Sequence, residues 1–191
     1  PAVVFIWAAL GVAPGQAAAP SCAPVVGNLV SVEGMVEVQR TDAPRWSEAA
    51  RDEGLCEGDS VRAGERSRAA IALVNDAVLR LDERTTIRLL DITAEPEQRS
   101  FLGLVRGAVQ FFSRKTRMMS INTPYLNATI EGTEFALSAG ETGPDIILFS
   151  GSVVAANDQG KVRIESGEAA SAAPGQPPQS RLVVRPRDAV S

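Results

Sequence analysis

The sequence of 191 residues contains no histidine and only two cysteines. The lack of histidine excludes hydrolases that use a histidine base, and it removes the commonest zinc ligand. Aromatic residues make up only 5% of the chain, so aliphatic residues and alanine must fill the core. Positive charge is not in excess either, because the net charge is -4 and the pI is near 5.0. We therefore expect no cofactor, no bound metal and no nucleic-acid partner.

Apolar runs long enough to cross a membrane are absent as well, since the longest run, residues 2–13, is too short for a span. Its position and the small residues Gly15, Ala17 and Ala19 after it are typical of a secretory signal peptide. We interpret residues 1–19 as this signal, with its positively charged first region missing and cleavage after Ala17 or Ala19. A buried segment of the fold is the alternative. The mature chain would then be exported and without a membrane span.

The two cysteines, Cys22 and Cys56, both follow the expected cleavage site. An even pair in an exported chain suggests one disulfide, which would tie the mature N-terminus to the interior. A buried Cys56 with a loose Cys22 is the alternative.

Short alternating runs separated by turn residues fill the sequence from residue 25 onward, and each has the length of a strand. Only residues 47–52 and 97–104 suggest short helical turns. The pattern predicts an all-β domain: a bent multi-strand sandwich, a jelly-roll-like barrel or an irregular β-solenoid. The expected strands are residues 25–30, 32–39, 60–63, 69–74, 78–81, 86–90, 105–113, 118–122, 127–130, 134–138, 145–149, 152–155 and 161–165.

Glycine recurs between paired strand-like runs, at Gly34, Gly107, Gly132 and Gly151. Glycine can adopt positive φ or permit close approach where a strand turns a corner or bulges. We therefore expect corners at these positions. The residues around Gly132, 123–137, read as two strands that meet at it.

One basic cluster, Arg114, Lys115 and Arg117, precedes two methionines. It could contact an acidic partner or anionic lipid head groups, but we favour a solvated strand end or loop, because so short a basic run supplies little binding at physiological salt. Trp46 reads as a core residue or a lid over one end of the sheets, with ligand stacking as the alternative. The composition becomes rich in proline and glycine after residue 173. We therefore expect a domain over residues 20–173, then a linker and the start of a further segment over residues 174–191.

Several separated blocks, in order over residues 25–170, resemble the FecR-type periplasmic domain, named for the ferric-citrate regulator. The signature is Thr123-Pro124 followed by Glu131-Gly132-Thr133-Glu134-Phe135. Glu131 stands where the family signature most often carries arginine. The other blocks are Gly27 to Val38, Trp46, Leu55 to Gly64, Arg68 to Ile71, Val78 to Leu81, Phe149 to Val153 and Glu165 to Glu168.

The resemblance implies a non-enzymatic, exported module in the periplasm or cell envelope of a bacterium, which contacts a protein partner or senses a signal. The alternatives are a structural module that binds a glycan or anionic polymer, and a regulator of sigma-factor signalling. The last is less favoured, since no anti-sigma segment or membrane span stands ahead of the domain. The tail after residue 182 resembles a subgroup in which tetratricopeptide repeats follow. Glu131 and Glu134 could form an acid and base pair, but we favour solvent-facing charge at the bend.

Overall fold

The computed structural model describes residues 24–95 and 97–183. These residues form fourteen strands that belong to one sheet, and every strand pair in it is antiparallel. The all-β prediction is confirmed. The strands are β1 (Val25–Glu33), β2 (Val36–Gln39), β3 (Trp46–Glu48), β4 (Gly54–Cys56), β5 (Ser60–Ala63), β6 (Arg68–Leu73), β7 (Ala77–Leu81), β8 (Thr86–Asp91), β9 (Ser100–Asn122), β10 (Asn127–Gly140), β11 (Gly143–Asn157), β12 (Gly160–Glu165), β13 (Glu168–Ser171) and β14 (Gln179–Leu182).

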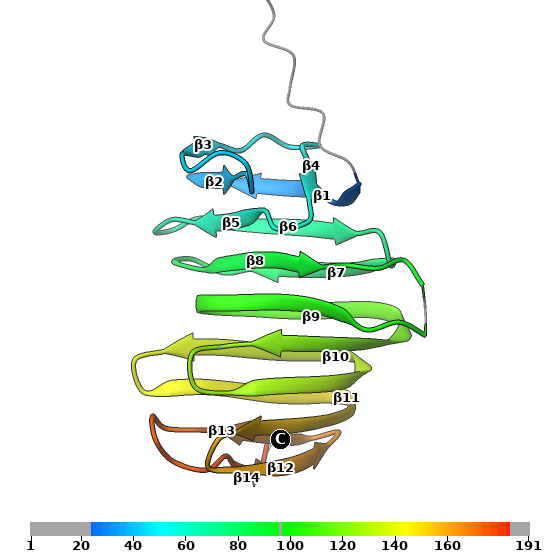
Figure 1. The fold of residues 1–191 in the computed structure, drawn as a ribbon, viewed down its shortest axis with the longest axis vertical. Coiled ribbons are helices and arrows are strands. Elements are labelled where there is room, and N and C mark those ends of the chain that lie inside the picture. The colour runs from blue at the N-terminus through cyan, green and yellow to red at the C-terminus, as the bar shows by residue number, and fades with distance from the viewer. Residues whose placement is uncertain (1–23, 96, 184–191) are drawn as a thin grey trace, which may run out of the picture.

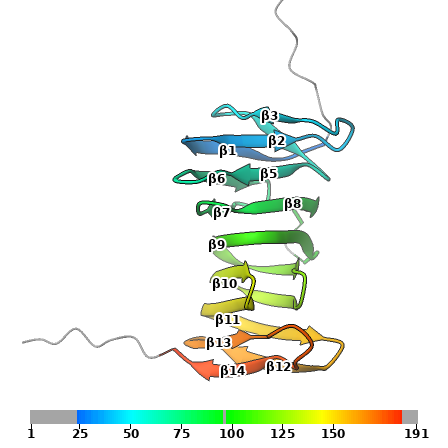
Figure 2. The ribbon, with the colours of Figure 1, turned by 90° about the vertical axis from the view of Figure 1, so that its left-hand side faces the viewer.

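The sheet is folded into two layers that face each other, and within each layer the strands lie across the long axis of the molecule and follow one another along it (Figures 1 and 2). Layer one runs through β4, β1, β6, β7, the middle of β9, the second half of β10, the first half of β11, β13 and β14. Layer two contains β3, β2, β5, β8 and the first part of β9, and then the last part of β9, the first half of β10, the second half of β11 and β12. The chain builds this stack by crossing repeatedly from one layer to the other.

Crossings in the first half of the chain gather along one edge, which we call the first corner edge. Gly34 lies against Ser67, Gly64 accepts a hydrogen bond from the backbone of Arg84, and Gly107 lies against Thr85. The φ of Gly107 is 90°, which disfavours any residue with a Cβ. The predicted corner at Gly107 is therefore present.

Crossings in the second half gather along the opposite edge, the second corner edge. Gly132 is in register with both Arg117 and Gly151, and the hydroxyl of Ser166 accepts a hydrogen bond from the Gly151 N–H at 3.0 Å. The predicted corners at Gly132 and Gly151 are therefore present too.

Strand β9 carries the chain from one corner edge to the other. Its first residues pair with β8, its middle pairs with β7 and the second half of β10, and its last residues pair with the first half of β10. It thus changes layer at Gly107 and again at residues 114–117. The sequence predicted only its middle and last parts.

The core lies between the two layers, where alternate side chains point inward. Phe111 of β9 and Phe135 of β10 are completely buried and stack with ring centroids 4.8 Å apart and planes inclined by 11°. Because β9 and β10 are neighbours in layer one, this pair fixes the centre of the stack.

Two kinds of expectation differ from the structure, the helical turns and the linker, and two others fall on residues that it does not describe. The helical turns predicted at residues 47–52 and 97–104 are wrong, because these stretches contain strand β3, the start of β9 and irregular turns instead. Part of the expected linker forms strand β14, which pairs with β13 and extends layer one past residue 173. The signal-peptide prediction for residues 1–19 and the predicted role of Cys22 lie outside the described residues.

Candidate functional site

The two halves of the signature lie at opposite ends of the first half of β10. Thr123 and Pro124 belong to the turn between β9 and β10, where the Thr123 hydroxyl donates to the carbonyl of Leu126 at 2.7 Å and accepts from its N–H at 3.1 Å. Gly132 stands at the second corner edge. The signature therefore fixes both ends of one strand. Its Thr123-Pro124 half borders a pocket, which the turn between β11 and β12 lines from the other side.

The two carboxylates of the signature do not converge. Glu131 is exposed on layer two, in register with Met118, whereas Glu134 continues into layer one and its Oε1 accepts a hydrogen bond from Gln110 at 3.1 Å. This arrangement fits charge at the surface of a bend and gives no support to an acid and base pair.

The backbones at the second corner edge approach each other closely. A Cβ placed on Gly132 would clash with the carbonyl oxygen of Ser150, and one placed on Gly151 would clash with Gly132. The φ of Gly151 is 117°, but Gly132 is not among the residues with positive φ. The need for glycine at position 132 is thus steric: of the two expected reasons, close approach applies here and positive φ does not. Thr133 is half-buried beside it, and Phe135 is in the core.

The basic cluster is divided by the structure. Arg117 has only 5% of its side chain exposed, and its Nη2 lies 3.5 Å from Oδ2 of Asp76 in the turn between β6 and β7. The prediction that Arg117 belongs to an open basic surface is wrong: residues 114–116 are all exposed where β9 changes layer, and Arg117, which follows them and pairs with Gly132, is buried. Its Nε and Nη1 have no hydrogen-bond partner among the described residues.

Arg114 and Lys115 remain on the surface. Together with Ala72, Val78 and Asp76 they line a hollow beside the turn between β6 and β7. Sequence alone could not place β7 next to this part of β9, because the two segments are separated by the whole of β8.

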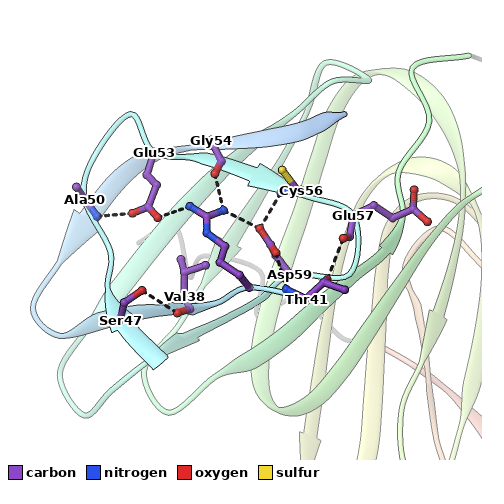
Figure 3. A network of polar contacts seen from close by, with 10 residues as sticks. Val38, Thr41, Ser47, Ala50, Glu53, Gly54, Cys56, Glu57 and Asp59 are labelled. Atoms are coloured by element: carbon purple, nitrogen blue, oxygen red, sulfur yellow. Dashed lines mark hydrogen bonds and ion pairs between the residues drawn. The ribbon is translucent and has the colours of Figure 1, made fainter. Parts of the chain in front are cut away.

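A second polar cluster lies near β2 and β4, at one end of the stack, and sequence reasoning missed it (Figures 1 and 3). Asp59, only 2% exposed, accepts hydrogen bonds from Arg40 Nη1 at 2.7 Å, the Cys56 N–H at 2.8 Å and the Thr41 N–H at 3.1 Å. Arg40 also reaches the carbonyl of Gly54 at 2.8 Å and Glu53 at 2.5 Å. These contacts join the loop after β2 to β4 and the turn before β5, so the cluster is structural. Its only sequence signal was the turn Glu57-Gly58-Asp59.

Trp46 lies on the edge strand β3, half-buried, with the guanidinium of Arg62 4.3 Å above its ring. Arg62 also donates to Glu37 at 2.5 Å, and this hydrogen bond holds the pKa of the Glu37 carboxyl below its ordinary value. Arg62 covers the indole, so Trp46 is neither a core residue nor an open platform for a ligand.

Neither a metal cluster nor a membrane-spanning helix can be built from the part of the chain that the structure describes. No three potential ligands gather there, and none of its residues forms a helix long and apolar enough to cross a bilayer. Cys56 is buried at the end of β4. Its pairing with Cys22 stays a prediction.

Comparison with known proteins places these features in a family. No curated protein sequence matches the chain. Two crystal structures of a proposed anti-sigma factor from Parabacteroides distasonis share the fold, each with 12% identity and a TM-score of 0.55. The alignment covers 64% of this chain and 59% of that one, so this chain spans well under two thirds of the other protein. A family model described as FecR protein matches residues 59–154, which is just over half of the 191 residues and runs from Asp59 through the second corner edge. The chain therefore belongs to the FecR family.

Proposed function

We propose that this chain is a non-enzymatic, exported module of the bacterial cell envelope that binds a protein partner as part of sensing or signalling. The observation that carries the proposal is the match to the FecR family over residues 59–154. Those residues build most of the corner edges and the centre of the stack, and those of them that the structure describes bring together no nucleophile and base. Membership of a regulatory family and the lack of a converged chemical site support the same function.

The stacked sheet suits such a role, because it holds its surface residues on strands that are paired on both sides. Val78 of β7, for example, is in register with Ala72 of β6 on one side and with Phe112 of β9 on the other. A surface of this kind loses little conformational entropy when a partner binds. Binding should therefore need no rearrangement of the described residues.

Partner capture in the native bacterium tests the proposal. A photo-crosslinking amino acid placed at exposed positions of the full chain should trap a defined protein in the periplasmic fraction, at some positions and not at others. N-terminal sequencing of the recovered chain should show loss of the predicted signal after Ala17 or Ala19. A chain that stays in the cytoplasm, or that traps no protein from any face, would contradict the proposal.

The same purified chain separates the alternatives. A rise in melting temperature with cell-wall fragments, without a protein partner, would support the glycan-binding or structural role. Sigma-factor regulation would require that deleting the gene changes the output of one sigma factor. A change in sigma-factor output would extend the proposed signalling role, whereas stabilisation by cell-wall fragments alone would replace that role.

A further inference from the structure

We propose that the hollow beside the turn between β6 and β7 is a docking groove for an acidic, extended segment of a protein partner that carries an apolar anchor. Ala72, Asp76, Val78, Arg114 and Lys115 line this groove, and Phe112 stands next to it. The inference rests on the proposed function, since it takes the occupant to be a protein.

The floor of the groove is an apolar strip on the outer face of layer one. Ala72 is in register with Val78, and Val78 with Phe112, so the three side chains form a row across β6, β7 and β9. Their neighbours along each strand, such as Leu79 and Phe111, are buried in the core, so this row faces outward. Phe112 is 46% exposed. The small side chain of Ala72 leaves room for an anchor beside Val78 and Phe112.

The rim of the groove is cationic. Arg114 and Lys115 are exposed and take part in none of the ion pairs found between described residues. Of the nearby acidic groups, Asp76 pairs with Arg117, and Glu134, in register with Phe112, is held by a hydrogen bond from Gln110 but keeps its charge, so it restricts acidic residues of a partner to the Arg114 and Lys115 side. Two cations are thus left available at the edge of an apolar strip, in a chain whose net charge is -4.

The apolar floor and the cationic rim together indicate which kind of partner segment would bind in the groove. Carboxylates would pair with Arg114 and Lys115, while an aliphatic or aromatic side chain next to them in the segment would cover Phe112 and Val78. A membrane surface fits less well, because two cations without an inserted apolar helix give too little attraction to hold a protein on an anionic bilayer.

Binding of synthetic peptides to the full chain tests the groove. The probes are short peptides in which one leucine or phenylalanine is flanked by aspartate and glutamate, and the same peptides with asparagine and glutamine in their place. Fluorescence anisotropy at low salt gives their affinities. We expect the acidic peptides to bind about tenfold more tightly than their amide counterparts, and added salt to reduce the difference.

Matched variants locate the binding. The double variant R114E/K115E should weaken the acidic peptides about tenfold or more, while R106E/K161E makes the same change of charge away from the groove and should leave affinity within about twofold. Likewise F112A should weaken binding, whereas F101A, which removes another exposed phenylalanine of β9, should not. Each variant is first checked for the wild-type melting temperature.

Several results would overturn the proposal: equal binding of acidic and amide peptides, equal losses in the control variants, or no measurable binding of any peptide. Binding of phosphatidylglycerol vesicles that depends on Arg114 and Lys115, without peptide binding, would assign the groove to lipid. Self-association that R114E/K115E abolishes would assign it to a second copy of the chain. If crosslinking identifies a protein partner whose affinity is the same for the wild type and for all the groove variants, the docking groove is disproved while the proposed function stands.

Discussion

Gly132 and Gly151 face each other across β10 and β11 so closely that neither position has room for a Cβ. A Cβ on Gly132 would lie closer than 3.0 Å to the backbone of Ser150, which cannot move without disturbing the ladder. The second corner edge is therefore fixed by backbone packing, and not only by the conformational freedom of glycine.

The variant G132A should lower the free energy of unfolding by about 1–3 kcal/mol, because the added methyl group overpacks the corner. G140A is the matched control in the same strand, since a Cβ there meets nothing within 4 Å and should change stability by less than about 0.5 kcal/mol. Urea denaturation measures both. Equal stability of the two variants would mean that the corner is looser than described.

Removal of the buried carboxylate in D59A should destabilise the protein by about 2–4 kcal/mol. It takes away one of the two carboxylates that pair with Arg40 and leaves the N–H groups of Cys56 and Thr41 without their acceptor. The exposed pair of Arg84 and Glu65 provides the control, and E65A should cost less than about 1 kcal/mol. Denaturant midpoints give the comparison. A neutral D59A would show that the cluster does not hold the loops together.

Acidic pH should lower the free energy of unfolding, partly because Glu37 becomes protonated. The hydrogen bond from Arg62 lowers the pKa of Glu37 in the folded state, so its contribution is complete above the unfolded pKa of about 4.3 and is lost as the pH falls through the folded pKa. The pKa of Asp82 is also lowered, first by the N–H of Glu83 and then by Arg68, and it acts in the same direction. Thermal melts from neutral to acidic pH should show a smaller loss of stability in E37Q than in the wild type. If the melting temperatures of E37Q and the wild type fall equally as the pH is lowered, Glu37 makes no such contribution.

The predicted disulfide between Cys22 and Cys56 should leave no thiol that reacts with an alkylating agent in denaturant without reductant, and two after reduction. Mass spectrometry counts the labels. On the chain-entropy estimate, closing this loop stabilises the fold by about 3–4 kcal/mol, so reduction should lower the melting temperature markedly. Two labelled thiols without reductant would show that the pair is not bonded.

Alternation of apolar and polar residues was enough to predict most of the strands, because a half-buried strand imposes a period of two on its sequence. The same signal failed for the start of β9, where Gln98 to Leu104 lacks clear alternation and suggested a helical turn. It also missed β3, β4, β13 and β14, which have three or four residues each and so give few positions from which to recognise a period.

The corners at Gly107, Gly132 and Gly151 could also be predicted, since glycine marks them in the sequence, whereas the layer change at residues 114–117, which contain no glycine, could not. Their assignment to two opposite edges could not, because it depends on how β9 passes around the stack. For the same reason the burial of Arg117 and the hollow beside Arg114 were not predictable: both depend on the turn between β6 and β7, which meets β9 only in the folded chain.

The strands lie across the long axis of the stack, with β1 and β4 near one end and β12, β13 and β14 at the other (Figure 1). A pull on the chain before β1 and after β14 would therefore act along the stack and load the hydrogen bonds of one ladder at a time. Such a load peels strands apart instead of shearing them, so the outermost strands would detach first and at low force. A domain of this design would yield gradually to tension from its neighbours in the chain.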